Sequence, residues 1–191
     1  RTDPDYFPAT VMNYKLGGTF SSNVNLILRE EKGYTYGAST GFSGTKIPGT
    51  FVASSSVRTN TTYESVQIFK EEIEKYKNGI SQEDLDFTKN ALIKSNARAF
   101  ESQFSLLRML QTMSSYNLPA DYKADEEGIV NAMTLEEHKR LANKHLDASK
   151  MGYLVVGDAA TQFENFKKAG FDEVILLDKD GNEVKVSNIK M

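Results

Sequence analysis

The opening part of the chain contains two stretches in which apolar and polar residues recur with the period of a helix. Residues 6–16 form the first stretch, and the glycine pair that follows them is typical of a helix end. Ser21 or Ser22 can cap a second helix, which we expect over residues 23–32. Gly33 is a natural stop for that helix. The pattern therefore predicts two short helices in succession.

A different periodicity begins directly after these helices. Residues 34–44 and 49–59 alternate small or polar residues with aromatic or aliphatic ones, and this alternation predicts two strands. The segment SGTKIPG between them is typical of a hairpin connection. The two strands are therefore expected to pair with each other.

The middle of the chain has the pattern of a helical block. Three of its helices are expected to begin at Thr61, Ser81 and Thr134, because each is followed three positions later by Glu or Asp. That spacing is the pattern of a capping box. The four helices predicted here cover residues 61–79, 81–99, 104–116 and 134–146.

The last part of the chain returns to strand patterns. Residues 151–158 form a short apolar run that suits a buried strand, and Asp158 can cap a helix that extends to Lys168. Residues 173–177 are predicted to form a strand, and residues 178–186 to turn it back as a hairpin. Strands and helices are partly segregated along the chain. This order favours the α+β class, as a two-layer sandwich of a mostly antiparallel sheet packed against helices.

Length, charge and composition narrow the possible functions. A chain of 191 residues can bury a sizeable core, so residues 1–191 are expected to form a single domain. The net charge of -3 argues against a nucleic-acid partner, because phosphate binding needs a basic face. The chain contains no run of about 18 apolar residues, so no membrane span is expected.

The chain has no cysteine, which excludes thiolate metal sites and leaves the compartment, cytoplasmic or periplasmic, open. It does not begin with Met, so we expect a fragment of a longer chain.

The two histidines, His138 and His145, give little support for a metal site. They lie seven positions apart on one predicted helix, which separates them by about 10 Å along the axis. Zinc-binding histidines on a helix usually lie about four positions apart, so that both nitrogens reach one ion. We therefore expect two partly exposed helix residues and no metal ligand in this chain.

The segment LREEKGYTYG contains the best candidates for chemistry. In a structural interpretation, Arg29 is a cation at the end of a helix, where it interacts favourably with the helix dipole. Tyr34 and Tyr36 would then share one face of a strand and pack there. In a functional interpretation, Arg29 and Tyr36 project to one surface and offer donors to a carbonyl oxygen that becomes an oxyanion. Such a pair stabilises charge but does not activate water, so a metal or a base would come from elsewhere.

The longer segment LGGTFSSNVNLILREEKGYTYGAST resembles the C-terminal, non-zinc-binding repeat of the M16, or pitrilysin-type, zinc metallopeptidases. The shared pattern is a helix that ends in Leu-Gly-Gly, a serine-rich cap, a helix that ends in Leu-Arg-Glu, and a strand that begins after glycine. Residues 69–95 resemble the helix-turn-helix that follows in the family, and residues 117–158 resemble its closing segment. The resemblance spans about residues 5–158.

The resemblance implies a role in a larger enzyme. Peptidases of the family are built from four such repeats, and the N-terminal repeat binds zinc through an HxxEH motif. That motif is absent here, so the chain is expected to hold no cofactor and to be inactive alone. The resemblance implies that Arg29 and Tyr36 are catalytic contacts that complete the site of a zinc-bearing M16 domain or subunit. Tyr34 stands where the family usually has leucine, so it is expected at the rim of a substrate site for peptides.

The chain departs from the family in one respect. The family repeat begins with strands ahead of its first helix, whereas here a helix begins almost at once. Missing N-terminal strands imply an exposed sheet edge, which is a hazard for strand pairing between copies. The alternative function is a non-catalytic structural or binding module of the same superfamily, since some members are core subunits of larger assemblies.

Overall fold

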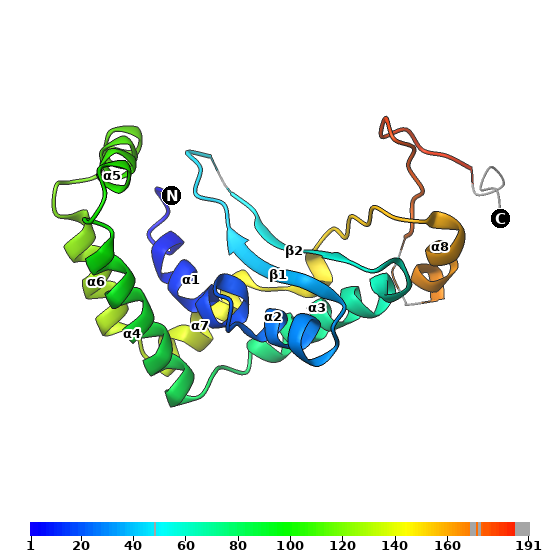
Figure 1. Ribbon diagram of the computed structural model, residues 1–191, viewed down its shortest axis with the longest axis horizontal. Coiled ribbons are helices and arrows are strands. Elements are labelled where there is room, and N and C mark those ends of the chain that lie inside the picture. Colours follow the sequence, from blue (N-terminus) through cyan, green and yellow to red (C-terminus); the bar gives the residue numbers. More distant parts are fainter. Residues whose placement is uncertain (48, 169–170, 172, 186–191) are drawn as a thin grey trace.

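The computed structural model describes residues 1–47, 49–168, 171 and 173–185. It confirms the α+β class, because helices cover one face of a small antiparallel sheet (Figure 1). The strands are β1 (Thr35–Phe42) and β2 (Phe51–Val57). The helices are α1 (Tyr6–Asn13), α2 (Asn23–Asn25), α3 (Thr62–Tyr76), α4 (Gln82–Arg98), α5 (Gln103–Tyr116), α6 (Tyr122–Ala132), α7 (Leu135–His145) and α8 (Ala159–Lys168).

Wider or tighter helical turns extend several of these elements. A π-helical turn over Tyr14–Gly18 continues α1, and another over Leu26–Glu31 continues α2. Single 3₁₀ turns cover Thr59–Thr61 before α3 and Ala148–Lys150 after α7. The two predicted N-terminal helices are therefore present, but each ends in a widened turn.

One face of the β1–β2 pair packs against the helices and forms part of the core. The strands pair antiparallel, with Phe42 opposite Phe51 at the hairpin end. The helices α1, α2 and α3 lie along the sheet in Figure 1. The largest fully buried apolar side chains come from α1, α3, α7 and the π-helical turns: Met12, Leu16, Leu28, Ile73 and Leu141.

Gly17 lets the end of the first helix approach the sheet closely. A Cβ at this position would lie 2.7 Å from the Cβ of Thr40, so no side chain fits there. The buried Asn13 sits beside this contact and donates from Nδ2 to the Thr40 carbonyl oxygen at 2.9 Å. The Gly-Gly pair is thus both a helix end and a point of close packing between helix and strand.

His138 of α7 is buried in the core, which corrects the expectation of a partly exposed residue. It is 1% exposed, and its Nε2 lies 3.1 Å from Tyr76 Oη of α3. Tyr76 in turn donates to the Met12 carbonyl oxygen of α1 at 2.8 Å. Burial lowers the pKa of His138 to about 4, so the ring is neutral near pH 7. The sequence did not show this link because Tyr76 lies far away along the chain.

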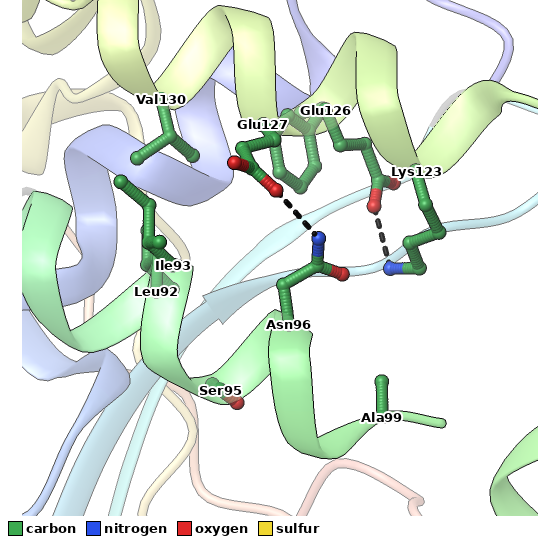
Figure 2. A pocket seen from close by; sticks show the side chains of 10 residues that line it. Leu92, Ile93, Ser95, Asn96, Ala99, Lys123, Glu126, Glu127 and Val130 are labelled. Carbon is green, nitrogen blue, oxygen red and sulfur yellow. Dashed lines mark hydrogen bonds and ion pairs between the residues drawn. The ribbon is translucent and has the colours of Figure 1, made fainter.

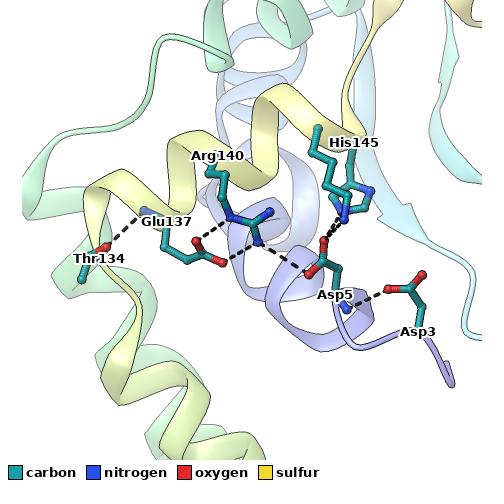
Figure 3. A network of polar contacts seen from close by, with 7 residues as sticks. Asp3, Asp5, Thr134, Glu137, Arg140 and His145 are labelled. Carbon is teal, nitrogen blue, oxygen red and sulfur yellow. Dashed lines mark hydrogen bonds and ion pairs between the residues drawn. The ribbon is translucent and has the colours of Figure 1, made fainter.

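The second histidine belongs to an ion-pair cluster that joins α1 to α7. Figure 3 shows Asp5, at the start of α1, facing Arg140 and His145 of α7. The Asp5 carboxylate also accepts from Lys144 Nζ at 2.6 Å. Hydrogen bonds from Lys144 and His145 lower the pKa of Asp5 to about 2. His145 Nε2 is held 3.0 Å from that carboxylate, so its role here is structural.

The remaining helices lie at the two ends of the molecule (Figure 1). α4 and α6 pack against each other at one end, and α8 lies at the opposite end. α6 was not among the predicted helices; a glycine lies in its interior, and its N-cap residue, Asp121, makes no side-chain capping hydrogen bond. None of the helices in the described part of the chain is long and apolar enough to cross a bilayer.

Neither strand predicted near the C-terminus forms a regular strand, although the predicted turn back after residue 177 is present. Residues 151–158 form no strand, and Leu154 and Val156 are 83% and 92% exposed instead of buried. An apolar run becomes a buried strand only when other strands pair with it, and the described residues supply none. Over residues 173–185 the structure shows a single bridge, between Leu177 and Glu183, around a tight turn. Residue 186, the last residue of the predicted hairpin, lies outside the described residues.

Candidate functional site

The turn between α2 and β1 places the predicted residues at one end of the sheet. Gly33 adopts a left-handed backbone conformation, with φ of +62°. Its N–H donates to the Arg29 carbonyl oxygen at 3.1 Å, and the next N–H, of Tyr34, donates to the Leu28 carbonyl oxygen at 2.8 Å. A residue with a Cβ is strained in this conformation, which is why glycine stands here. The turn therefore ends the helix and starts the strand within three residues.

Arg29 is held by contacts of its guanidinium group with two neighbouring side chains. Its Cζ lies 4.3 Å from the centre of the Phe20 ring, a cation–π contact. Its Nε lies 3.4 Å from the Glu30 carboxylate. The side chain is partly exposed, so N–H groups remain accessible from the solvent side. Arg29 is thus oriented by its neighbours and available to a ligand.

The two tyrosines occupy different environments, although a regular strand would place them on the same face. Tyr34 is half-buried and packs against the hydrophobic core. Tyr36 is 97% exposed. Tyr34 precedes β1, whereas Tyr36 lies within the strand, at an irregularity in the pairing of β1 with β2 between Thr35 and Ala38. Nothing in the local sequence pattern marks this irregularity.

The three predicted residues line one open cleft of about 660 Å³. Arg29 and Glu30 approach it from the π-helical turn, and Tyr34 and Tyr36 from the start of β1. The structure adds Arg58, just after β2, which sequence analysis did not select. The Arg58 guanidinium donates to the Gly33 carbonyl oxygen, and its backbone N–H donates to the Tyr34 carbonyl oxygen at 3.2 Å. A search for charged residues flanking the paired strands could have found it.

The cleft can bind and polarise a carbonyl group, because it combines a guanidinium with an exposed phenol. Activation of water by a metal would need ligands that the described residues do not bring together. No group of three or more acidic, histidine or cysteine side chains in the described part of the chain could hold a metal ion. His138 and His145 are both engaged in structural contacts. Zinc therefore does not fit the residues of this site.

A second, smaller cavity of about 160 Å³ lies between α4 and α6 (Figure 2). Its charged side chains are engaged with neighbours in the wall. Asn96 donates to Glu127 at 3.2 Å, and Lys123 donates to Glu126 at 2.6 Å, as Figure 2 shows. None of the residues predicted for the site reaches this cavity. We interpret it as a packing gap between two helices.

Comparisons with known proteins agree with the fold. The profile of a family described as peptidase M16 inactive domain matches residues 1–92, a span that includes both strands and the cleft. No curated protein matches the sequence significantly.

Solved structures give the same result over more of the chain. The crystal structure of a peptidase M16 inactive domain from Pseudomonas fluorescens is 30% identical, with a TM-score of 0.70. The match covers 81% of this chain and 39% of that one. A protease from Helicobacter pylori is 18% identical, with a TM-score of 0.62, over 75% of this chain and 35% of that one. A candidate zinc protease from Bordetella pertussis is 16% identical, with a TM-score of 0.61, over 80% and 87% of the two chains. The chain thus spans less than half the length of the first two proteins, and the last two show a shared fold.

Proposed function

Because the chain belongs to the M16 peptidase family through its inactive domain, we propose that it completes the active site of a zinc-dependent endopeptidase. In this proposal the chain binds peptide substrates and contributes Arg29 and Tyr36 to a site whose zinc is held by a partner domain or subunit. The observation that carries the proposal is that these two side chains line the same open cleft. Peptides or unfolded segments are the proposed substrates, because closure of two halves around a site excludes large folded proteins.

The chemistry follows from the exposure and the orientation of the two donors. The Tyr36 side chain is almost fully exposed, so its hydroxyl is free to donate to the oxygen of a scissile carbonyl as charge develops there. Arg29 presents a planar set of N–H donors, held in place by Phe20 and Glu30. It would bind a neighbouring peptide carbonyl or orient Tyr36. Tyr34, whose ring is partly buried, would form the rim of the site.

Zinc would belong to the partner, where it supplies a water activated for attack on the peptide bond. The residues described here would bind the peptide, orient its carbonyl group and stabilise negative charge on the oxygen. The two halves would depend on each other, since neither holds both the metal and these donors.

The test uses the intact protein that contains this chain and its zinc-bearing partner. Hydrolysis of an unstructured peptide is expected to stop when a chelator is added and to return with zinc. Arg29→Ala is expected to lower kcat/KM about 100-fold or more, and Arg29→Lys to recover little, since an ammonium group lacks the planar set of donors. Arg98→Ala, at the exposed end of α4, is the matched control and should leave kcat/KM unchanged. Hydrolysis that tolerates Arg29→Ala, or an assembled protein with no peptidase activity, would favour the non-catalytic module instead.

A further inference from the structure

β1 contains one extra residue at its start. Ala38 pairs with Ser55 in the antiparallel ladder. Before that pair, Tyr36 and Gly37 together stand opposite the single residue Ser56. Two residues facing one is a β-bulge, a feature that often lies beside active sites and re-aims a side chain.

The bulge determines the direction of Tyr36. Side chains of a regular strand alternate between faces, so counting back from the buried Ala38 would put Tyr36 on the inner face. The extra residue reverses this alternation. Thr35 therefore shares the inner face with Val57 opposite it, whereas Tyr36 is 97% exposed. Without the bulge, the Tyr36 phenol would point away from the cleft.

Two hydroxyl groups replace the ladder hydrogen bonds that the bulge interrupts. The Gly37 N–H donates to Thr35 Oγ1 at 3.0 Å, and this hydroxyl lies 2.7 Å from the Ser56 carbonyl oxygen. Ser55 Oγ lies 2.9 Å from Thr35 Oγ1 and also 2.9 Å from the Gly37 carbonyl oxygen. Each hydroxyl has one proton, so Thr35 can donate to Ser56 while Ser55 donates to Gly37. Together they satisfy three backbone groups of the bulge.

Groups outside the bulge fix its two ends. On one side, the Ala38 N–H donates to Asn25 Oδ1 of α2 at 2.9 Å. On the other side, Arg58 donates to the carbonyl oxygens of Gly33 and Tyr34. The centre of the bulge, which carries Tyr36, depends on the hydroxyls of Thr35 and Ser55.

We propose that Thr35 and Ser55 are positioning residues that hold the Tyr36 phenol in the cleft. They act through the backbone on either side of Tyr36 and are not catalytic residues themselves. The expected effect on turnover rests on the proposed function of Tyr36, whereas the expected effect on the bulge does not.

Steady-state kinetics of the intact protein test the effect on turnover. Thr35→Val keeps the shape of the side chain and removes its hydroxyl. We expect kcat to fall about 10- to 100-fold, the size of effect that follows misplacement of a catalytic group by about 1 Å. KM should change little, because Arg29 is untouched. Thr35→Ser restores the hydroxyl and should restore kcat, which a purely structural loss would not explain.

A second variant and a matched control distinguish the proposed effect on kcat from a folding defect. Ser55→Ala is expected to lower kcat in the same direction as Thr35→Val. Ser54→Ala removes a neighbouring hydroxyl on the exposed face of β2 and should have no effect. The melting temperature of each variant is measured alongside.

Amide hydrogen exchange of the same intact protein tests the bulge directly. Thr35→Val removes the acceptor of the Gly37 N–H, so exchange in the peptide that contains Gly37 should be at least about fivefold faster. Unchanged exchange there would overturn the proposal. Unchanged kcat in both Thr35→Val and Ser55→Ala would also overturn the proposal, provided that Tyr36→Phe lowers kcat in the same assay. If Tyr36→Phe itself has no effect, the proposed function fails, and the exchange result alone decides whether the two hydroxyls hold the bulge.

Discussion

Mild acid is expected to destabilise this protein through His138. The ring belongs to α7 and is buried, with its Nε2 atom 3.1 Å from the Tyr76 hydroxyl of α3. That hydroxyl in turn bonds to α1. Burial lowers the pKa of His138 from the ordinary 6.5 to about 4. In the unfolded chain the same ring is solvated and titrates normally. Protonation therefore favours the unfolded state.

The sign and the size of the effect follow from the two pKa values. Below pH 6.5 the unfolded chain binds a proton that the folded protein does not, so stability falls as the pH falls. The stabilisation is complete above pH 6.5 and is lost between 6.5 and about 4. The total loss amounts to about 3 kcal/mol, of which about 2 kcal/mol falls between pH 7 and 5.

Urea unfolding at about pH 7, 6 and 5 measures this loss directly. The comparison variant is His138→Gln, whose amide can still donate to Tyr76 and does not titrate. We expect the unfolding free energy of the wild-type protein to fall by about 2 kcal/mol over this range, and that of the variant by less than about 0.5 kcal/mol. Equal pH dependence in the two proteins would refute the reasoning.

Three further predictions concern packing, helix propensity and the exposed apolar segment. Gly17→Ala should lower the unfolding free energy by about 1–3 kcal/mol, because the new methyl group overlaps Thr40. Gly128→Ala, in the open interior of α6, should raise the unfolding free energy by about 0.5–1 kcal/mol. Urea unfolding measures both variants. A higher unfolding free energy for Gly17→Ala would contradict the close packing against Thr40. Replacing Leu154 and Val156 with lysine should reduce self-association of the isolated chain in light scattering, because these exposed side chains lie in a segment that pairs with no strand among the described residues. Unchanged association would show that another surface is responsible.

Local signals in the sequence predicted the turn that carries the cleft. Gly33 marked the end of a helix, and the alternation after it marked a strand, so the turn between Arg29 and Tyr36 was predicted from the sequence. Ser81 and Thr134 were correctly identified as caps, since each accepts from the backbone N–H three residues later. Thr61 was also predicted to be a cap, but its hydroxyl donates to the Arg58 carbonyl oxygen instead.

The features that sequence analysis missed depend on residues far apart in the chain. The outward direction of Tyr36 depends on Ser55, which reaches the bulge from the opposite strand. Burial of His138 depends on Tyr76, on another helix. The apolar run over residues 151–158 was assigned as a strand from its composition, but strand formation requires a partner strand that composition does not reveal.

The most direct measurement of the central claim is kcat for peptide hydrolysis by Tyr36→Phe in the intact protein. This change removes one hydroxyl and leaves the ring. Tyr14→Phe, whose ring packs on Phe87, is the control with the same chemical change. The account predicts a fall of about 100- to 1000-fold for Tyr36→Phe and none for the control. A kcat within about twofold of wild type would contradict the role of Tyr36 as a donor to the oxyanion.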